Sequence, residues 1–529
     1  MNDFPYLSVL TAAPLVGAVV VVLLPRHRPE LAKRVALGWS LAVLVLAGAA
    51  WAAFEAGGDR LQLRESYPWI PRWGVNFTFA ADGIALVMLA LIALLVPLVI
   101  LASWHDADAS GRSEAKPAVI ASGPGVTASP TAKRSVPAFF ALILVLETTM
   151  IGVFAAADVF LFYVFFEVML VPMYFLIGSY GGTRRQYAAV KFFLYSLVGG
   201  LFMLAALIGL WVAGGQTLDW QLLTQADLST GVERWLFLGF FLAFAIKAPF
   251  FPFHTWLPDA GGAAPAGVAA LLVGLLDKVA TFGILRYALP LFPNASRWFA
   301  PAALTLAVIG IIYAALLAVG QNDLKRLVAY TSIAHFGFIG VGIFAFTSQA
   351  GTGAVLYMVN HGLATGLLFL VVGMFVARRG SALITDFGGA GKLVPVLAGV
   401  LLFAGLASLS LPGLAPFVSE FLVLVGTFTV NKPVAVIATV GIILAAGYVL
   451  WMIQRTTQGT LNPTLSAVPR MRRDLTLRES FVVAPLIALI IVLGLYPKPL
   501  TDVINPAVEA TLTHVDATDP APEVPEAQP

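Results

Sequence analysis

The stretch LFYVFFEVMLVPMYFLIG, residues 161–178, is apolar along its whole length except for one carboxylate, Glu167. Its length approaches the roughly 20 residues that an α-helix needs to cross the hydrocarbon core of a bilayer. Similar apolar runs recur throughout the chain, and their spacing predicts about fourteen transmembrane helices. The sequence therefore predicts an all-α, polytopic membrane protein.

Composition supports this fold class and limits the chemistry of the chain. Only 11% of the 529 residues are charged and 59% are hydrophobic, whereas soluble domains average about 25% charged residues. Cysteine is absent, which excludes disulfides, thiolate-held iron-sulfur clusters and Cys-type zinc sites. The sequence also lacks a phosphate-binding loop, a nucleophile constellation and a metal-ligand cluster. We therefore expect no cofactor, no metal and no catalytic chemistry in the isolated chain.

The basic residues of the connections predict the orientation in the membrane. They collect in alternate connections: Arg26, Arg28, Lys33 and Arg34; Lys133 and Arg134; Arg184 and Arg185; Lys325 and Arg326; Arg378 and Arg379; and Arg455, Arg470, Arg472, Arg473 and Arg478. The positive-inside rule places these connections in the cytoplasm and both termini on the outer side. The Gly/Ser/Ala/Pro-rich segment 105–135 is predicted to be a cytoplasmic loop insertion. The acidic segment from 502 onward is predicted to be a disordered outward tail.

Two proline-interrupted segments indicate an internal repeat. They are FAIKAPFFPFHTWLPDA (244–260) and LSLPGLAPFVSEF (409–421). Proline removes a backbone donor and clashes with the preceding turn, so each segment predicts a broken helix inside the protein or beside water. The offset from Lys247 to Glu420 is 420 − 247 = 173, and that from Glu167 to His335 is 335 − 167 = 168. Two five-helix repeats would produce these offsets. The predicted domains are 1–135, 136–289, 290–455 and 456–529.

Several ionisable residues lie within the apolar runs. They are Glu167, Lys191, Lys247, Asp277, Lys278, His335, His361 and Glu420. A charge at the bilayer centre costs about 2.5–3.5 kcal/mol even on insertion scales, so such residues usually mark ion or proton paths. Taken singly, a histidine can satisfy a backbone carbonyl, Lys191 can snorkel, and Asp277 can neutralise Lys278. Their occurrence in a series of helices favours a proton relay.

Lysine and glutamate suit such a relay. A buried lysine can release its proton, whereas arginine stays charged. A Glu–Lys contact that forms and breaks can therefore load and unload a proton.

The chain resembles a known family of membrane proteins. FEVMLVPMYFLIG (166–178), KAPFFPFHTWLPDA (247–260), QNDLKRLVAYTSIAHFGF (321–338), NHGLATGLLF (360–369) and LPGLAPFVSEF (411–421) resemble the antiporter-like proton-pumping subunits of respiratory complex I, the NADH-quinone oxidoreductase. The resemblance covers roughly residues 60–500 and implies fourteen helices in which the two five-helix repeats are inverted.

The resemblance also implies roles for the site residues. Glu167 and Lys247 correspond to the charge pair that senses the neighbouring subunit. Lys278, His335 and His361 correspond to a connecting row, and Glu420 to the terminal site of the outer half-channel. In subunit N of this family the last position is a lysine, and subunit L is longer with a lateral helix. These differences favour the third antiporter-like subunit.

The implied function is proton translocation across the bacterial plasma membrane, driven by quinone reduction elsewhere in the complex. The implied partners are other complex I subunits, especially the antiporter-like subunits L and N, and membrane lipid, without nucleic acid. NADH, flavin, iron-sulfur clusters and quinone are expected in the partner subunits.

Two other functions compete with this interpretation. A large subunit of a multi-subunit sodium/proton antiporter shares the motifs and the fold. An inert membrane scaffold would keep the same charges merely as pairs between helices. The scaffold predicts that Lys247→Ala leaves pumping intact, whereas the relay predicts a severe loss.

Overall fold

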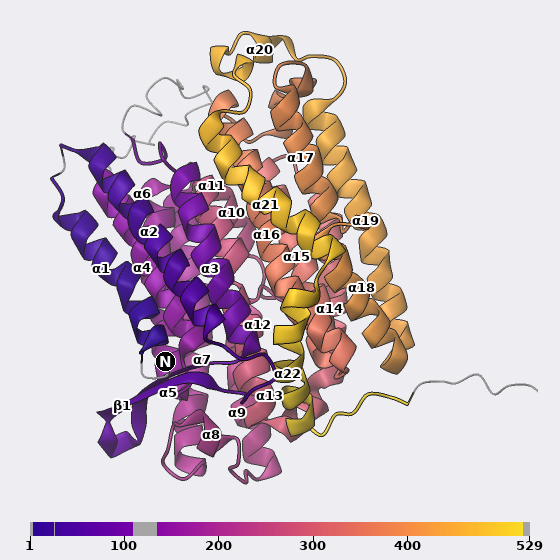
Figure 1. The fold of residues 1–529 in the computed structure, drawn as a ribbon. Helices are drawn as coiled ribbons and strands as arrows, with labels where there is room; N and C mark the ends of the chain where they lie inside the picture. Colours follow the sequence, from indigo (N-terminus) through magenta and orange to yellow (C-terminus); the bar gives the residue numbers. More distant parts are fainter. Residues whose placement is uncertain (1–3, 26, 109–134, 522–529) are drawn as a thin grey trace, which may run out of the picture.

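The structure is a computed structural model that describes residues 4–25, 27–108 and 135–521. The loop insertion predicted at 105–135 lies almost wholly outside the described residues, as does the end of the acidic tail. Figure 1 shows a bundle of long helices that run roughly side by side between two opposite faces.

The prediction of an all-α membrane protein is confirmed. Twelve helical spans among the described residues are long and apolar enough to cross a membrane. The long helices are α1 (Tyr6–Leu23), α2 (Pro29–Ala52), α3 (Gly83–Ala102), α4 (Val136–Ala155), α7 (Arg185–Ala213), α9 (Thr230–Lys247), α14 (Pro293–Val319), α15 (Leu324–Phe344), α16 (Ser348–Arg379), α19 (Lys432–Thr457), α21 (Leu477–Leu495) and α22 (Lys498–His514).

The shorter elements include the halves of interrupted helices. They are α5 (Val159–Val168), α6 (Leu170–Tyr180), α8 (Trp220–Leu223), α10 (Leu257–Ala263), α11 (Ala266–Leu271), α12 (Lys278–Gly283), α13 (Leu289–Leu291), α17 (Pro395–Ser408), α18 (Ala415–Val430), α20 (Pro463–Ser466), the π-helical segments η3 (Leu272–Leu276) and η4 (Ile284–Ala288), and the 3-10 turns η1 (Pro71–Trp73), η5 (Ile384–Asp386), η6 (Ala390–Lys392) and η7 (Pro469–Arg472). Helix α9, which carries three charged residues, helix α22 and the short pair α17 and α18 fall outside the twelve spans. Two of the twelve spans are instead made of shorter elements, Val159–Tyr180 (α5 and α6) and Ala266–Leu291 (α11 to α13).

Both predicted helix breaks are confirmed. Helix α9 ends at Lys247, and helix structure resumes at α10 after the proline-rich segment 248–256. Helix α17 ends at Ser408, and α18 begins at Ala415 after the segment that contains Pro412. Each break places a titratable side chain at or near a helix end inside the bundle.

The core of the bundle lies around α16. Helices α3, α4, α15 and α16 and the segment from α11 to α13 are almost wholly buried, whereas α1, α2, α7, α19 and α21 expose most of their apolar side chains. Helix α16 packs against α11, α15, α17 and α18. The titratable side chains next to the two breaks, Lys247 and Glu420, are buried within the bundle.

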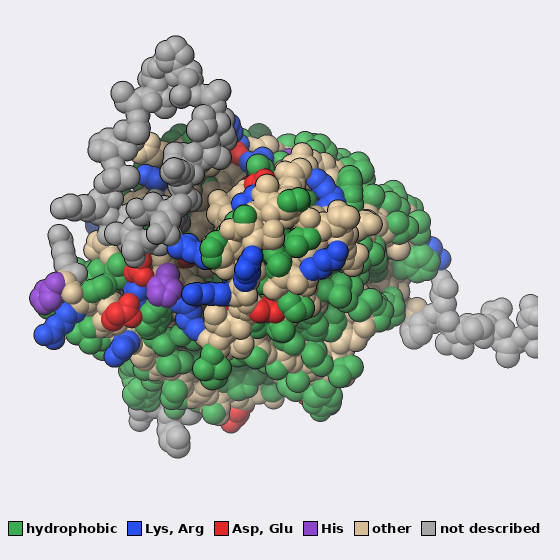
Figure 2. Space-filling model, turned by 90° about the horizontal axis from the view of Figure 1, so that it is seen from above, with side chains coloured by type: hydrophobic (Ala, Val, Ile, Leu, Met, Phe, Trp, Pro, Cys, Tyr) green, Lys and Arg blue, Asp and Glu red, His purple; other side chains and the backbone are tan. Residues whose placement is uncertain are grey.

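Basic residues gather on one face of the molecule. The connection from α19 to α21, which contains α20, lies at the top of Figure 1, whereas α8, α22 and the start of α1 lie at the other end. Figure 2 views this top face and shows lysine and arginine side chains clustered on it. The two ends of the described chain therefore lie on the face opposite the basic connections.

The sequence analysis missed a β-hairpin on that opposite face. Strands β1 (Gln62–Ile70) and β2 (Val75–Ala81) pair antiparallel. Asp82 follows β2, caps α3 by accepting from Ala85 N at 2.8 Å, and accepts from the buried guanidinium of Arg286. This ion pair, which directly follows the hairpin in the chain, anchors the start of α3 to η4.

The prediction of a disordered tail from 502 is wrong over residues 502–514, which belong to α22. Its apolar residues recur at helical spacing and are buried against α3, α13 and α16: Val503, Ile504, Ala507, Val508, Thr511 and Leu512. This periodicity was present in the sequence, but the acidic residues and prolines between these positions obscured it. A helix with one apolar face lies flat on the bundle and buries that face.

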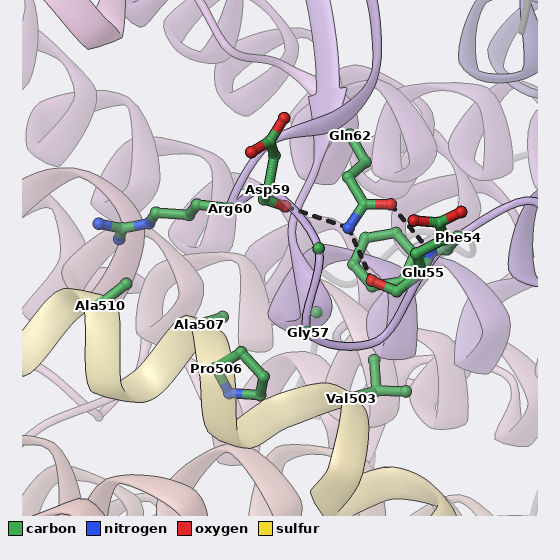
Figure 3. A pocket seen from close by; sticks show the side chains of 12 residues that line it. Phe54, Glu55, Gly57, Asp59, Arg60, Gln62, Val503, Pro506, Ala507 and Ala510 are labelled. Atoms are coloured by element: carbon green, nitrogen blue, oxygen red, sulfur yellow. Dashed lines mark hydrogen bonds between the residues drawn. The ribbon is translucent and has the colours of Figure 1, made fainter.

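A cavity of about 160 Å³ separates α22 from the loop before the hairpin. Figure 3 shows Val503, Pro506, Ala507 and Ala510 of α22 on one side and Arg60 with its loop on the other. The guanidinium of Arg60 donates to Thr511 Oγ1 at 2.8 Å and lies 5.0 Å from the ring centre of Trp220. These contacts fasten α22 to the hairpin side of the bundle.

Candidate functional site

Lys247 lies at the first helix break and is completely buried. It is the last residue of α9. Its ammonium donates to the backbone carbonyl of Phe166 at 2.9 Å and lies 3.7 Å from the centre of the Phe166 ring. The indole of Trp256 donates to Ile246 O at 2.8 Å, which satisfies one carbonyl left free where α9 ends. The break therefore holds the amine inside the bundle against α5.

Glu167 lies beside this amine but does not contact it. It precedes the short interruption at Met169 between α5 and α6, and its Oε1 is buried without a hydrogen-bond partner among the described residues. No described amine lies within 4.0 Å of it, so the expected Glu167–Lys247 pair is not a formed ion pair in this structure. Lys247 instead bonds to the backbone of the preceding residue, Phe166.

The Glu167 carboxylate occupies a slot made by a glycine. A Cβ placed on Gly200 of α7 would lie 1.8 Å from Oε1 and 2.4 Å from Cδ of Glu167. Any side chain at 200 would therefore displace the carboxylate.

Lys278 lies at the start of the buried row and contacts its next member, His361. Its ammonium contacts the backbone carbonyl of Val273 and His361 Nδ1, the latter at 2.6 Å. His361 Nε2 lies 3.0 Å from Ser332 Oγ. A neutral imidazole that accepts from Lys278 at Nδ1 and donates from Nε2 to Ser332 satisfies both contacts. A proton can then move between Lys278 and His361 along an existing hydrogen bond.

His335 continues the row by ring contact. Its ring centre lies 5.2 Å from that of His361 and 5.9 Å from that of Tyr357. Its Nδ1 is buried without a hydrogen-bond partner among the described side chains. This nitrogen can therefore form a hydrogen bond with a neighbouring polar group that moves into reach.

Glu420 ends the row and has two hydroxyl donors. Its Oε2 accepts from Tyr357 Oη at 3.0 Å and from Ser410 Oγ. Ser410 lies in the second helix break with φ of 60°, a left-handed conformation uncommon for residues other than glycine. The break thus turns the serine hydroxyl toward the acid.

The structure brings together Lys278, His335, His361 and Glu420, and it places Glu167 and Lys247 next to each other without contact. Sequence reasoning missed Tyr357 and Ser410, whose roles depend on how helices pack. It also missed Glu147 of α4, whose two carboxylate oxygens are buried without partners among the described groups. Glu147 stands as isolated in its apolar run as Glu167, so the same sequence rule could have found it.

Lys191 belongs to a different cluster. Its ammonium lies 2.8 Å from Asp259 Oδ2, and the other oxygen of this acid accepts from Arg326 at 2.6 Å. The cluster is partly exposed. Lys191 is therefore paired outside the buried row.

Comparisons with known proteins agree with this geometry. The family described as NADH:quinone oxidoreductase/Mrp antiporter, TM matches residues 156–445. NADH-quinone oxidoreductase subunit M of Mycobacterium tuberculosis is 48% identical, over 99% of this chain and 97% of the relative.

Two solved structures share the fold. A chain of respiratory complex I from Thermus thermophilus with bound NADH matches with a TM-score of 0.83 and 30% identity, over 96% of this chain and 99% of that chain. A chain of the Mrp complex from Dietzia matches with a TM-score of 0.79 and 20% identity, over 97% and 100%.

Proposed function

This chain belongs to the family of membrane-spanning subunits shared by NADH:quinone oxidoreductases and Mrp antiporters, and on that premise we propose that it is subunit M of NADH-quinone oxidoreductase. In this role it translocates protons across the membrane while quinone is reduced elsewhere in the complex. The high identity to a subunit M over nearly the full length of both chains supports this assignment.

The main observation in support of this function is the buried row from Lys278 to Glu420. Hydrogen bonds or ring contacts join Lys278, His361, His335, Tyr357 and Glu420 in succession. The row runs from α12 through α15 and α16 to α18, deep within protein. A scaffold gains little from buried ionisable groups, because apolar residues of similar volume stabilise as well or better.

The residues have separate roles in this proposal. Glu167 and Lys247 form the input, where a movement of the neighbouring subunit brings the carboxylate to the amine or withdraws it. Lys278, His361 and His335 carry the proton along the row. Glu420 releases it toward the outer face. Moving one charge against 100 mV requires about 2.3 kcal/mol, comparable to the roughly 1.5–3 kcal/mol released when one hydrogen bond to a charged group forms.

The proposal includes a setting for the chain in the membrane. The partners are other subunits of complex I, above all the antiporter-like subunits L and N, with lipid around the exposed apolar helices. NADH, flavin, iron-sulfur clusters and quinone reside in partner subunits, and this chain performs no redox step itself. The clustering of basic connections on one face supports a cytoplasmic position for that face and an outward position for both termini, in the bacterial plasma membrane.

The sodium/proton antiporter remains the second candidate. The similarity to the Mrp complex, at 20% identity, extends to the fold alone. The much higher identity to a complex I subunit favours proton pumping coupled to quinone reduction.

The test uses the assembled complex in inside-out membrane vesicles. Lys247→Ala should abolish most NADH-driven proton uptake, and wild-type uptake should persist in sodium-free buffer. Lys432→Ala, at an exposed helix start, is the matched control and should pump normally. Wild-type uptake by Lys247→Ala would contradict the proposal. So would purification of the chain with small antiporter subunits in place of quinone-reductase and iron-sulfur subunits.

A further inference from the structure

Asp277 is a buried carboxyl group that the row described above does not use. Its side chain is 0% exposed, and neither carboxylate oxygen has a hydrogen-bond partner among the described residues. Removing a carboxylate from water costs several kcal/mol, and only partners offset that cost. An apolar residue would occupy this position without the penalty, so the acid serves no evident structural purpose.

The local backbone places Asp277 at the junction of the two halves of the site. It directly follows the π-helical segment η3, and its backbone N–H donates to Leu272 O, five residues back, at 3.1 Å. Single π-helical turns occur frequently at functional sites. Helix α12 packs against α9 and against α4, while η3 packs against α16. The segment with Asp277 therefore lies between the helix of Lys247 and the helix of His361.

Two amines attract this carboxylate, but neither binds it. Asp277 interacts electrostatically with both Lys247 and Lys278. The ammonium of Lys247 is bonded to Phe166 O, and that of Lys278 to Val273 O and His361. No described amine lies within 4.0 Å of the Asp277 carboxylate, so the neutralising pair with Lys278 considered from the sequence is absent.

We propose that Asp277 carries the proton from Lys247 to Lys278. The inference rests on the proposed function and supplies the link missing between its input and its row. In the first step the Lys247 ammonium gives a proton to the Asp277 carboxylate, which leaves a neutral amine and a carboxylic acid. In the second step that acid gives the proton to the neutral Lys278 amine, which restores the carboxylate and forms an ammonium. Each transfer requires the two groups to come within hydrogen-bonding distance, directly or through one water molecule.

A structural role predicts a different response to substitution. Asparagine has the shape of aspartate but cannot ionise, whereas glutamate keeps the carboxyl group on a longer arm. If Asp277 only fills space, Asp277→Asn should behave like the wild type. If it carries protons, Asp277→Asn should fail and Asp277→Glu should restore much of the activity.

The experiment measures NADH-driven proton uptake by the full complex in inside-out vesicles, with assembly checked by native electrophoresis. Asp277→Asn should assemble and lower uptake about tenfold or more, and Asp277→Glu should recover most of it. The infrared difference spectrum between NADH-energised and resting complex should lose one carboxyl band in Asp277→Asn, a change that a space-filling role would not produce.

Lys247→Ala, measured in parallel, separates the two proposals. Normal uptake in Asp277→Asn with none in Lys247→Ala would overturn the role of Asp277 and leave the function standing. Equal impairment of Asp277→Asn and Asp277→Glu would also overturn it. Normal uptake in both Asp277→Asn and Lys247→Ala would overturn the proposed function itself.

Discussion

Gly200→Ala tests the position of Glu167 without removing any titratable group. The new Cβ would lie 1.8 Å from Oε1, 2.4 Å from Cδ and 2.9 Å from Oε2 of Glu167. A carbon and an oxygen without a bond approach to about 3.3 Å at closest. The carboxylate must therefore move by about 1.5 Å, because the α7 backbone that carries the Cβ is held by its own helical hydrogen bonds.

A displacement of this size should affect pumping strongly. Misplacing a reacting group by about 1 Å can lower a rate about a hundredfold. We expect NADH-driven proton uptake in vesicles to fall between about tenfold and a hundredfold, with normal amounts of assembled complex. Gly447→Ala is the control, because a Cβ at that helical glycine meets no atom within 4 Å.

A compensating substitution makes the test specific. Glu167→Asp shortens the side chain by one carbon–carbon bond, about 1.5 Å, which matches the displacement that Gly200→Ala imposes. The double variant should therefore pump better than Gly200→Ala alone. Wild-type uptake by Gly200→Ala would refute the argument that Gly200 sets the carboxylate's position. So would a double variant whose fold-loss of proton uptake equals the product of the fold-losses of the two single variants.

Three further predictions concern the rest of the bundle. Tyr357→Phe removes the 3.0 Å hydrogen bond to Glu420 and should lower proton uptake several-fold; unchanged uptake would remove the tyrosine from the row. Asp82→Asn leaves the buried Arg286 without its counter-charge and should destabilise the chain by about 3–5 kcal/mol, seen as a lower melting temperature; an unchanged melting temperature would contradict this. Val508→Asp places a charge in the buried face of α22 and should release that helix to added protease, whereas equal protection would show that α22 is held by other contacts.

Sequence patterns predicted the helices and both breaks because these depend on local chemistry. A long apolar run must satisfy its backbone internally in lipid, and the closely spaced prolines of the two predicted segments favour a break there. The ionisable residues were equally visible, since an isolated charge stands out in an apolar run. Glu147 meets the same criterion, so its sequence signal was present as well.

Other features of the site and the fold could not be predicted from the sequence. The slot for Glu167 depends on Gly200, a residue on another helix whose importance appears only when the two helices are packed. The hydroxyls of Tyr357 and Ser410 reach Glu420 through tertiary contacts and through a backbone conformation specific to the second break. Helix α22 was hidden because acidic residues and prolines suggest disorder, while its apolar face is stabilised only by the bundle beneath it.

In the proposed relay, the site has a part that switches and a part that conducts. Glu167 and Asp277 have carboxylate oxygens without a hydrogen-bond partner among the described residues, and Lys247 donates to one backbone carbonyl. Such groups can change partners at the expense of about one hydrogen bond, roughly 1.5–3 kcal/mol when a charge is involved. Lys278, His361 and Glu420 each have a side-chain hydrogen bond already formed. In the proposed relay the energy-dependent step therefore lies before Lys278, where a small movement of a neighbouring subunit would decide whether acid and amine meet.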